Sequence, residues 1–84
     1  KVKTTNSELA ETLVGLLGGA DNIVEVDNCT TRLRLKVKDS ANIKDSEIKK
    51  LVPGVLKPSK ESVQVIIGPH VEFVATELKR ILGK

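Results

Sequence analysis

Two stretches of the chain carry apolar residues at the three- and four-residue spacing of an amphipathic helix. The first stretch holds these apolar side chains: Leu9, Leu13, Val14, Leu16 and Leu17. The second holds these: Val71, Val74, Ala75, Leu78, Ile81 and Leu82. Thr5 stands three residues before Glu8, the capping-box pattern of a helix start. Gly18, Gly19 and Gly83 indicate where the two helices end, because glycine readily adopts the left-handed conformation.

A different period governs residues 31–38, where apolar and hydrophilic side chains alternate as in a half-buried strand. One side holds Leu33, Leu35 and Val37. The other side holds a basic row: Arg32, Arg34, Lys36 and Lys38. A short apolar run at residues 23–26 precedes it, so we expect an antiparallel hairpin with one buried face and one basic, solvated face.

The second half of the chain predicts a short helix, two strands and the final helix. Asp45 or Ser46 is expected to cap the short helix, which Pro53 and Gly54 end. Residues 55–57 and 63–67 read as strands separated by the polar stretch 58–62. Pro69 suits the first turn of the last helix.

The element order is therefore α-β-β-α-β-β-α. Four strands and three one-faced helices predict an α+β two-layer sandwich: a four-stranded, mainly antiparallel sheet with three helices on one face. The chain of 84 residues holds one small domain. We expect residues 1–4 to be a tail or linker and residues 5–84 to be the domain.

Composition narrows the chemistry. The chain is 39% hydrophobic and 30% charged, as in globular proteins, and it has a net charge of +3 that favours acidic partners without requiring nucleic acid. Cys29 is the only cysteine and His70 the only histidine, so an intramolecular disulfide is excluded and the strong metal ligands are too few. No apolar run approaches the roughly 20 residues of a membrane span. No metal and no cofactor are implied.

The densest group of reactive side chains lies between the first two strands. There the turn chemistry of residues 27–30 should place the Cys29 thiol in partial contact with solvent. Arg32 and Arg34 supply nearby positive charge, the amides of residues 29–32 can form an anion-binding nest, and Thr30 and Thr31 add hydroxyl donors. A thiolate in such surroundings can attack an electrophile or carry a dianion, so a phosphate-carrying cysteine is one hypothesis.

Other interpretations of these residues stay open. If the strand ran unbroken through position 29, Cys29 would share the side of Leu33 and be a small buried hydrophobic residue. The basic row could be an ordinary solvated strand face, or the surface of a regulatory or nucleic-acid-binding module. A cysteine hydrolase using Cys29, His70 and Asp27 is conceivable by residue type alone.

The run Asp-Asn-Cys-Thr-Thr-Arg-Leu-Arg, which begins at Asp27, resembles the Asn/Ala-Cys-x-Thr-Arg-Leu-Arg signature of one family. That family comprises the B domains (EIIB) of the glucose superfamily of bacterial sugar phosphotransferase system enzyme II. The resemblance covers most of the chain, including Gly-Gly-Ala-Asp-Asn-Ile, Val-Pro-Gly-Val and Val-Gln-Val-Ile-Ile-Gly. The family fold is a four-stranded antiparallel sheet with three helices on one side, which agrees with the predicted order.

The resemblance also implies a function. Cys29 would accept a phosphoryl group from a phosphohistidine of the EIIA domain or protein and pass it to a sugar held by the EIIC membrane domain. The signature arginines map onto Arg32 and Arg34, associated in the family with transfer to sugar. Thr31 matches the signature threonine, and Asn28 precedes the cysteine. With Thr30, these two complete the phosphate-binding residues that we expect.

Partners and place follow in the same way. EIIA and EIIC would be the partners, with no nucleic acid, and the domain would lie at the cytoplasmic face of the membrane, as part of a larger membrane protein. The sugar site belongs to EIIC in the family. The stretches that begin at Lys57 and Gly68 look more like members handling glucose or glucosides such as maltose than like N-acetylglucosamine members.

Overall fold

The computed structural model describes residues 6–84. The predicted tail and the capping-box residue Thr5 lie outside these residues. The elements follow in the order α1 (Asn6–Leu16), η1 (Ala20–Asn22), β1 (Ile23–Asn28), β2 (Arg32–Val37), η2 (Ser40–Asn42), α2 (Asp45–Lys49), β3 (Gly54–Ser59), β4 (Ser62–Ile66) and α3 (Val71–Leu82). The two η elements are single 3₁₀ turns that the apolar pattern does not predict.

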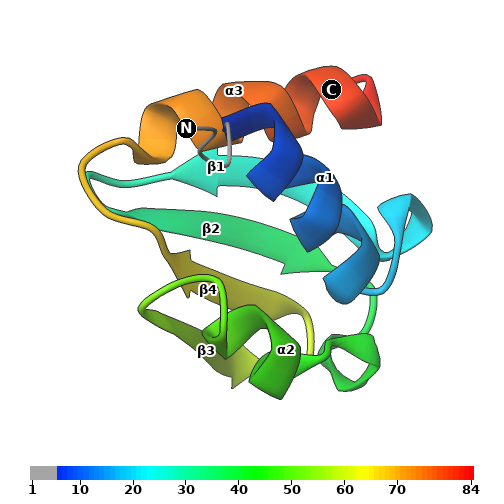
Figure 1. Cartoon of the computed structure of the whole chain (residues 1–84). Coiled ribbons are helices and arrows are strands. Elements are labelled where there is room, and N and C mark those ends of the chain that lie inside the picture. The colour runs from blue at the N-terminus through cyan, green and yellow to red at the C-terminus, as the bar shows by residue number, and fades with distance from the viewer. Residues whose placement is uncertain (1–5) are drawn as a thin grey trace.

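The four strands form one antiparallel sheet with the spatial order β1-β2-β4-β3. The last strand therefore pairs with both β2 and β3 and lies inside the sheet. Figure 1 shows α1, α2 and α3 on the same side of this sheet. The prediction of an α+β two-layer sandwich with three helices on one face is confirmed.

The core lies between the two layers and is almost entirely aliphatic. Leu33, Leu35 and Val37 of β2 are at most 4% exposed, and the intervening basic residues face away from the helices, as the alternation predicts. Leu13, Val74 and Leu78 supply the helical side and are fully buried. Burying a side chain of this size stabilises the fold by about 1.5–3 kcal/mol, so this two-sided packing fixes which face of the sheet stays open.

Three local predictions are wrong in detail. The structure has Lys44, not Asp45 or Ser46, at the N-cap of α2, with no side-chain hydrogen bond to the cap. Strand β3 runs on through Pro58 to Ser59, which an edge strand tolerates because one side of its backbone has no ladder to complete. Pro69 lies in the turn before α3, whose N-cap is His70.

The buried polar residue Asn22 connects the end of α1 to the segment after β2. It lies at the end of the sheet opposite to the β1–β2 loop. The Asn22 side-chain amide donates to the carbonyl oxygens of Leu17 (2.8 Å) and Asp39 (3.1 Å), and its oxygen accepts from the Asp39 amide (3.0 Å). These bonds satisfy a buried carbonyl at the end of α1 and partly buried backbone groups after β2 that would otherwise lack partners. Gly18, at φ +96°, passes so close that a Cβ there would lie 2.7 Å from the Asn22 amide nitrogen.

Candidate functional site

Cys29 occupies the first position of the connection between β1 and β2. Strand β1 ends at Asn28 and β2 starts at Arg32, and the Cys29 amide donates to the Arg32 carbonyl oxygen over 2.9 Å. This bond closes the hairpin and leaves the thiol outside both strands. Cys29 is exposed, so the alternative of a small buried hydrophobic residue is wrong.

The surroundings of the sulfur favour its ionised form. The pKa of the Cys29 thiol is lowered first by hydrogen bonds from the backbone N–H groups of Thr31 and Arg32. The slight desolvation at the loop opposes this, and the charges of Arg32 and Arg34 add to the lowering of the pKa. Part of the predicted nest therefore exists, but the Cys29 amide is not in it because it bonds to the Arg32 carbonyl.

The side chains just before the sulfur stabilise the turn. Asp27 accepts a hydrogen bond from the Asn28 amide (2.8 Å), as its turn chemistry predicts, and the Asn28 side-chain nitrogen donates to the Cys29 carbonyl oxygen (3.0 Å). Both residues belong to β1, so the turn is shorter than predicted. Asn28 thus holds the loop with one of its two amide hydrogens and has the other available.

The loop is also tied to the segment that leads into α3. The Thr31 carbonyl oxygen accepts hydrogen bonds from the amides of Ile67 and Gly68, each at 2.9 Å. Figure 1 shows these two connections side by side at one end of the sheet. Between them lies an open depression of about 520 Å³, lined by Asn28, Cys29, Thr30, Pro69 and Glu72. The sulfur therefore faces a space that a partner's reactive group can enter.

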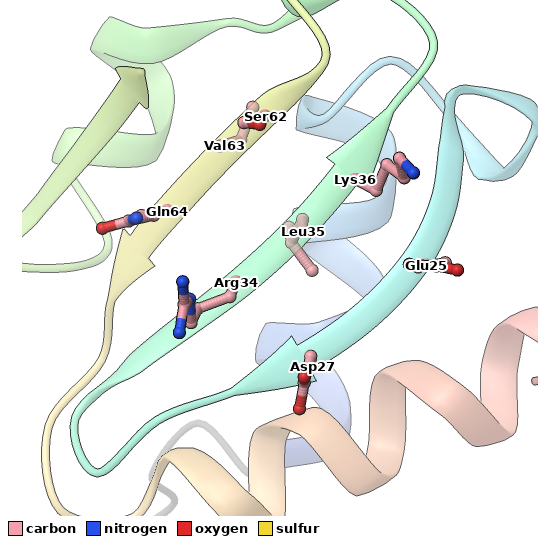
Figure 2. Close-up of a pocket in the computed structure, with 8 residues that line it drawn as sticks. All are labelled: Glu25, Asp27, Arg34, Leu35, Lys36, Ser62, Val63 and Gln64. Carbon is pink, nitrogen blue, oxygen red and sulfur yellow. The ribbon is translucent and has the colours of Figure 1, made fainter. Parts of the chain in front are cut away.

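The two arginines lie on the open face of the sheet in different states. Arg32 is half-buried and its Nη1 donates to the Gln64 side-chain oxygen at 2.9 Å. Arg34 is exposed, and within residues 6–84 no hydrogen bond or ion pair engages its guanidinium group. It lines a second open depression, of about 360 Å³, shown in Figure 2 with the helices behind the sheet. Sequence reasoning missed Gln64, although its place between Val63 and Val65 does predict an outward side chain.

The open face carries both signs of charge. Asp27 lies opposite Arg34 in the β1–β2 register, and Glu25 lies opposite Lys36. Figure 2 shows the acidic pair on β1 and the basic pair on β2. The basic row therefore does not form a uniformly positive surface of the kind that nucleic-acid binding requires.

The structure does not bring together the three side chains that a cysteine hydrolase would need. His70 is the N-cap residue of α3, with its ring beside Gly68, and it does not line the Cys29 depression. Among the described residues, no hydrogen bond joins Cys29, His70 and Asp27. Nor do residues 6–84 contain a group of three or more His, Cys, Asp or Glu side chains placed to hold a metal ion. In the same range, no helix is long and apolar enough to cross a membrane.

The fold and the site define a class: a small α+β domain that presents one activated thiol on a hairpin loop. A family model described as phosphotransferase system, EIIB, matches residues 11–44. A crystal structure of one domain of the PTS system IIabc component from Clostridium difficile superposes with a TM-score of 0.84 and 32% identity, covering 95% of this chain and 86% of that one. The chain belongs to the EIIB family of the glucose-type phosphotransferase system.

Curated relatives support the assignment. The N-acetylglucosamine-specific EIICB component of Bacillus subtilis is 53% identical over 64 residues, or 75% of this chain and 14% of that protein. The N-acetylglucosamine-specific EIICBA component of Klebsiella pneumoniae is 40% identical over 79 residues, or 93% and 12%. The maltose-specific EIICB component of Escherichia coli is 45% identical over 67 residues, or 79% and 13%. These identities do not favour the maltose relative over the N-acetylglucosamine ones. The chain spans 12–14% of the length of these three relatives.

Proposed function

We propose that Cys29 is the phosphoryl-carrying residue of this domain, which takes the group from a phosphohistidine and hands it to a sugar. The observation that carries the proposal is the exposed thiol on the β1–β2 loop, with the N–H groups of Thr31 and Arg32 at the sulfur and a lowered pKa. A thiolate is the nucleophilic form of cysteine, so the same donors that lower the pKa raise its reactive fraction near neutral pH.

In the loading step the Cys29 thiolate attacks the phosphorus atom of the donor. The S–P bond forms as the P–N bond to the donor imidazole breaks, and the imidazole nitrogen keeps the electron pair and takes up a proton. The protein's main task in such a transfer is positioning and charge stabilisation. The N–H groups of Thr31 and Arg32 meet the sulfur, while the Thr30 and Thr31 hydroxyls and the second Asn28 amide hydrogen are the remaining loop donors for the phosphoryl oxygens.

In the unloading step a sugar hydroxyl attacks the same phosphorus atom. The O–P bond forms, the S–P bond breaks, the thiolate is restored and the hydroxyl proton leaves to a base of the partner or to solvent. Arg32 and Arg34 neutralise the charge on the transferring group, because a guanidinium can bind two phosphoryl oxygens at once. Arg34 has every N–H group available for this within the described chain.

The partners that fit this cycle are the EIIA domain or protein as donor and the membrane-embedded EIIC domain, with its bound sugar, as acceptor. Both must reach the same sulfur in turn, which fits a site on a protruding loop with an open depression beside it. Because the two partners bind the same surface one after the other, each interface should be weak and partly polar. Exchange with these two partners requires the domain to lie at the cytoplasmic face of the membrane. N-acetylglucosamine and maltose are the first sugars to test.

The relay is tested by phosphorylation of the purified domain. Incubation with the phosphorylated EIIA donor is expected to add the mass of one phosphoryl group, on Cys29, as an acid-labile thiophosphate. Cys29→Ser should abolish the added mass, and Ser40→Ala, a substitution in η2 away from the depression, should leave it unchanged. Phosphorylation of the Cys29→Ser variant at the rate of the wild type would refute the proposal.

A further inference from the structure

The hydrogen bond between Arg32 and Gln64 runs along the sheet and not straight across it. In the β2–β4 register Arg32 lies opposite Ile66, and Gln64 lies opposite Arg34. Ile66 is at the end of β4 nearest the Cys29 loop, so Gln64 lies two residues further from that loop. At about 3.3 Å per residue, the Arg32 side chain reaches about 7 Å along β4 to meet its acceptor. The bond therefore holds the guanidinium toward the middle of the open face.

The acceptor is fixed by its strand. Gln64 stands between Val63 and Val65, both fully buried, and β4 is paired on both sides. Its side chain lies on the open face, where Figure 2 labels it next to Arg34. Arg32, by contrast, is the first residue of β2, at the end of the loop that carries the sulfur. The long Arg32 side chain is therefore held by one acceptor on a strand that is paired on both sides, while the Cys29 loop lies next to the start of β2.

We propose that Gln64 is a positioning residue that holds the Arg32 guanidinium over the middle of the open sheet face while the Cys29 thiol is unmodified, and releases it when an anion is attached to the sulfur. This proposal has two parts, the resting position of Arg32 and its release. The release rests on the proposed function, because the anion that the phosphoryl transfer would attach to the sulfur is a phosphoryl group. The resting part does not depend on the relay.

The exchange is favourable because the two acceptors differ in charge. The Gln64 oxygen is neutral, whereas an anion on the sulfur would give the guanidinium a hydrogen bond between two ionised groups, which is shorter and stronger. A dianion on the sulfur also attracts the guanidinium over a longer range and can be bound by two N–H groups together. The unmodified sulfur carries at most a single charge and has no oxygen atoms for two N–H groups to bind together, so the Gln64 amide holds Arg32 until the sulfur is loaded.

If Gln64 holds Arg32 away from the sulfur at rest, removing the Gln64 oxygen should change the alkylation rate of Cys29. Gln64→Met keeps the length of the side chain and removes the oxygen acceptor, which frees Arg32 to turn toward the thiolate. The rate of Cys29 alkylation by iodoacetamide, at a pH below the thiol pKa, should rise about twofold, as expected when one screened positive charge moves several ångströms closer. Gln64→Ala should do the same, and Ser62→Ala, on the same face of β4, should not.

A double variant tests whether the effect of Gln64→Met on the alkylation rate acts through Arg32. In an Arg32→Ala background, Gln64→Met should leave the alkylation rate unchanged. An unchanged or slower rate in the single variants, or the same rise in the Arg32→Ala background, would overturn the proposal. Circular dichroism of each variant confirms that the comparison is between folded proteins.

The release part is tested with a matched pair of adducts. Iodoacetate attaches a carboxylate to the Cys29 sulfur, and iodoacetamide attaches its neutral isostere. The side-chain amide NMR signals of Gln64 should shift in the carboxymethyl protein relative to the carbamidomethyl protein, and not when Arg32 is alanine. Equal spectra for the two adducts would overturn release. No phosphoryl donor is used, so failure of the relay and failure of this inference are distinguished.

Discussion

The carbonyl oxygen of Thr31 accepts a hydrogen bond from the amide of Gly68, 2.9 Å away, and so joins the Cys29 loop to the connection between β4 and α3. A short loop is usually the most mobile part of a hairpin. Here the residue whose N–H meets the sulfur is held at its carbonyl by a segment from the other end of the chain. The position of the sulfur thus depends on the conformation of Gly68.

Gly68→Ala tests that dependence. Gly68 has φ +122°, which residues with a side chain rarely adopt, although the nearest atoms to a Cβ there, in the His70 ring, are 3.6 Å away. The strain should cost about 1–2 kcal/mol of unfolding free energy, measured by urea denaturation. If the loop shifts with it, the Thr31 amide leaves the sulfur and the alkylation rate of Cys29 at neutral pH falls.

The control for this substitution is Gly15→Ala. Gly15 lies inside α1, has no positive φ, and has no atom within 4 Å of the point that an alanine Cβ would occupy. Alanine there should stabilise the protein by about 0.5–1 kcal/mol and leave Cys29 alkylation unchanged. A loss of stability at Gly15 equal to that at Gly68 would contradict the argument from backbone conformation.

The pH dependence of Cys29 alkylation follows from the lowered pKa. Because the N–H groups of Thr31 and Arg32 stabilise the thiolate, the alkylation rate of the folded protein should rise with a midpoint below that of the urea-unfolded chain. The unfolded chain should titrate near the ordinary cysteine pKa of about 8.5. Coincident midpoints in the two states would show that the amides do not act on the sulfur.

The same shift links the thiol to stability. A group whose pKa is lower in the folded state stabilises the fold in its ionised form, so its contribution is lost as the pH falls through the folded pKa. The unfolding free energy of the wild type, compared with Cys29→Ser, should therefore increase as the pH is raised through the folded thiol pKa. It should level off above about pH 8.5, where the unfolded thiol has also ionised. If the unfolding free energy of the wild type relative to Cys29→Ser decreased over this pH range, the thiol pKa could not be lower in the folded state.

Arg34→Gln should separate the two steps of the proposed relay. Its guanidinium is exposed and has no partner within residues 6–84, so the substitution removes a charge without breaking a structural bond. Loss of a charge-assisted hydrogen bond to the transferring group should slow transfer to sugar about tenfold or more, and loading from the donor less. Single-turnover measurements of each step decide this, and equal losses in both would contradict the assigned role.

Asn22→Leu should be among the most destabilising single changes. Leucine cannot make the three hydrogen bonds of the Asn22 side chain and leaves a buried carbonyl of Leu17 and partly buried backbone groups of Asp39 unpaired. The expected loss is about 2–4 kcal/mol of unfolding free energy. Asn42→Ala, at an exposed position in η2, should change stability by less than about 0.5 kcal/mol. Comparable losses at both positions would show that the three hydrogen bonds of the Asn22 side chain do not stabilise the fold.

Local pattern was sufficient for the existence and order of the three α-helices and four strands, and for the two faces of β2. The alternation of residues 31–38 predicts a strand, and it also predicts that Leu33 is buried and Arg34 exposed, since side chains on a strand alternate between faces. Polar turn residues next to Cys29 favoured its exposure but left a buried position open, and the hairpin geometry decides for exposure. Where the local signal was ambiguous, at the cap of α2 and along β3 through Pro58, the boundaries were wrong.

The sequence by itself determined most of the side chains that form the core, where the chain turns, and that a thiol and two arginines share one hairpin. Only the tertiary structure decided that β4 lies beside β2, which brings Gln64 to Arg32, and that Gly68 holds the carbonyl of Thr31. The reason is physical. Periodicity records how each residue meets its near neighbours along the chain, whereas the pairing of distant strands depends on how the helices pack and which strand edges remain free.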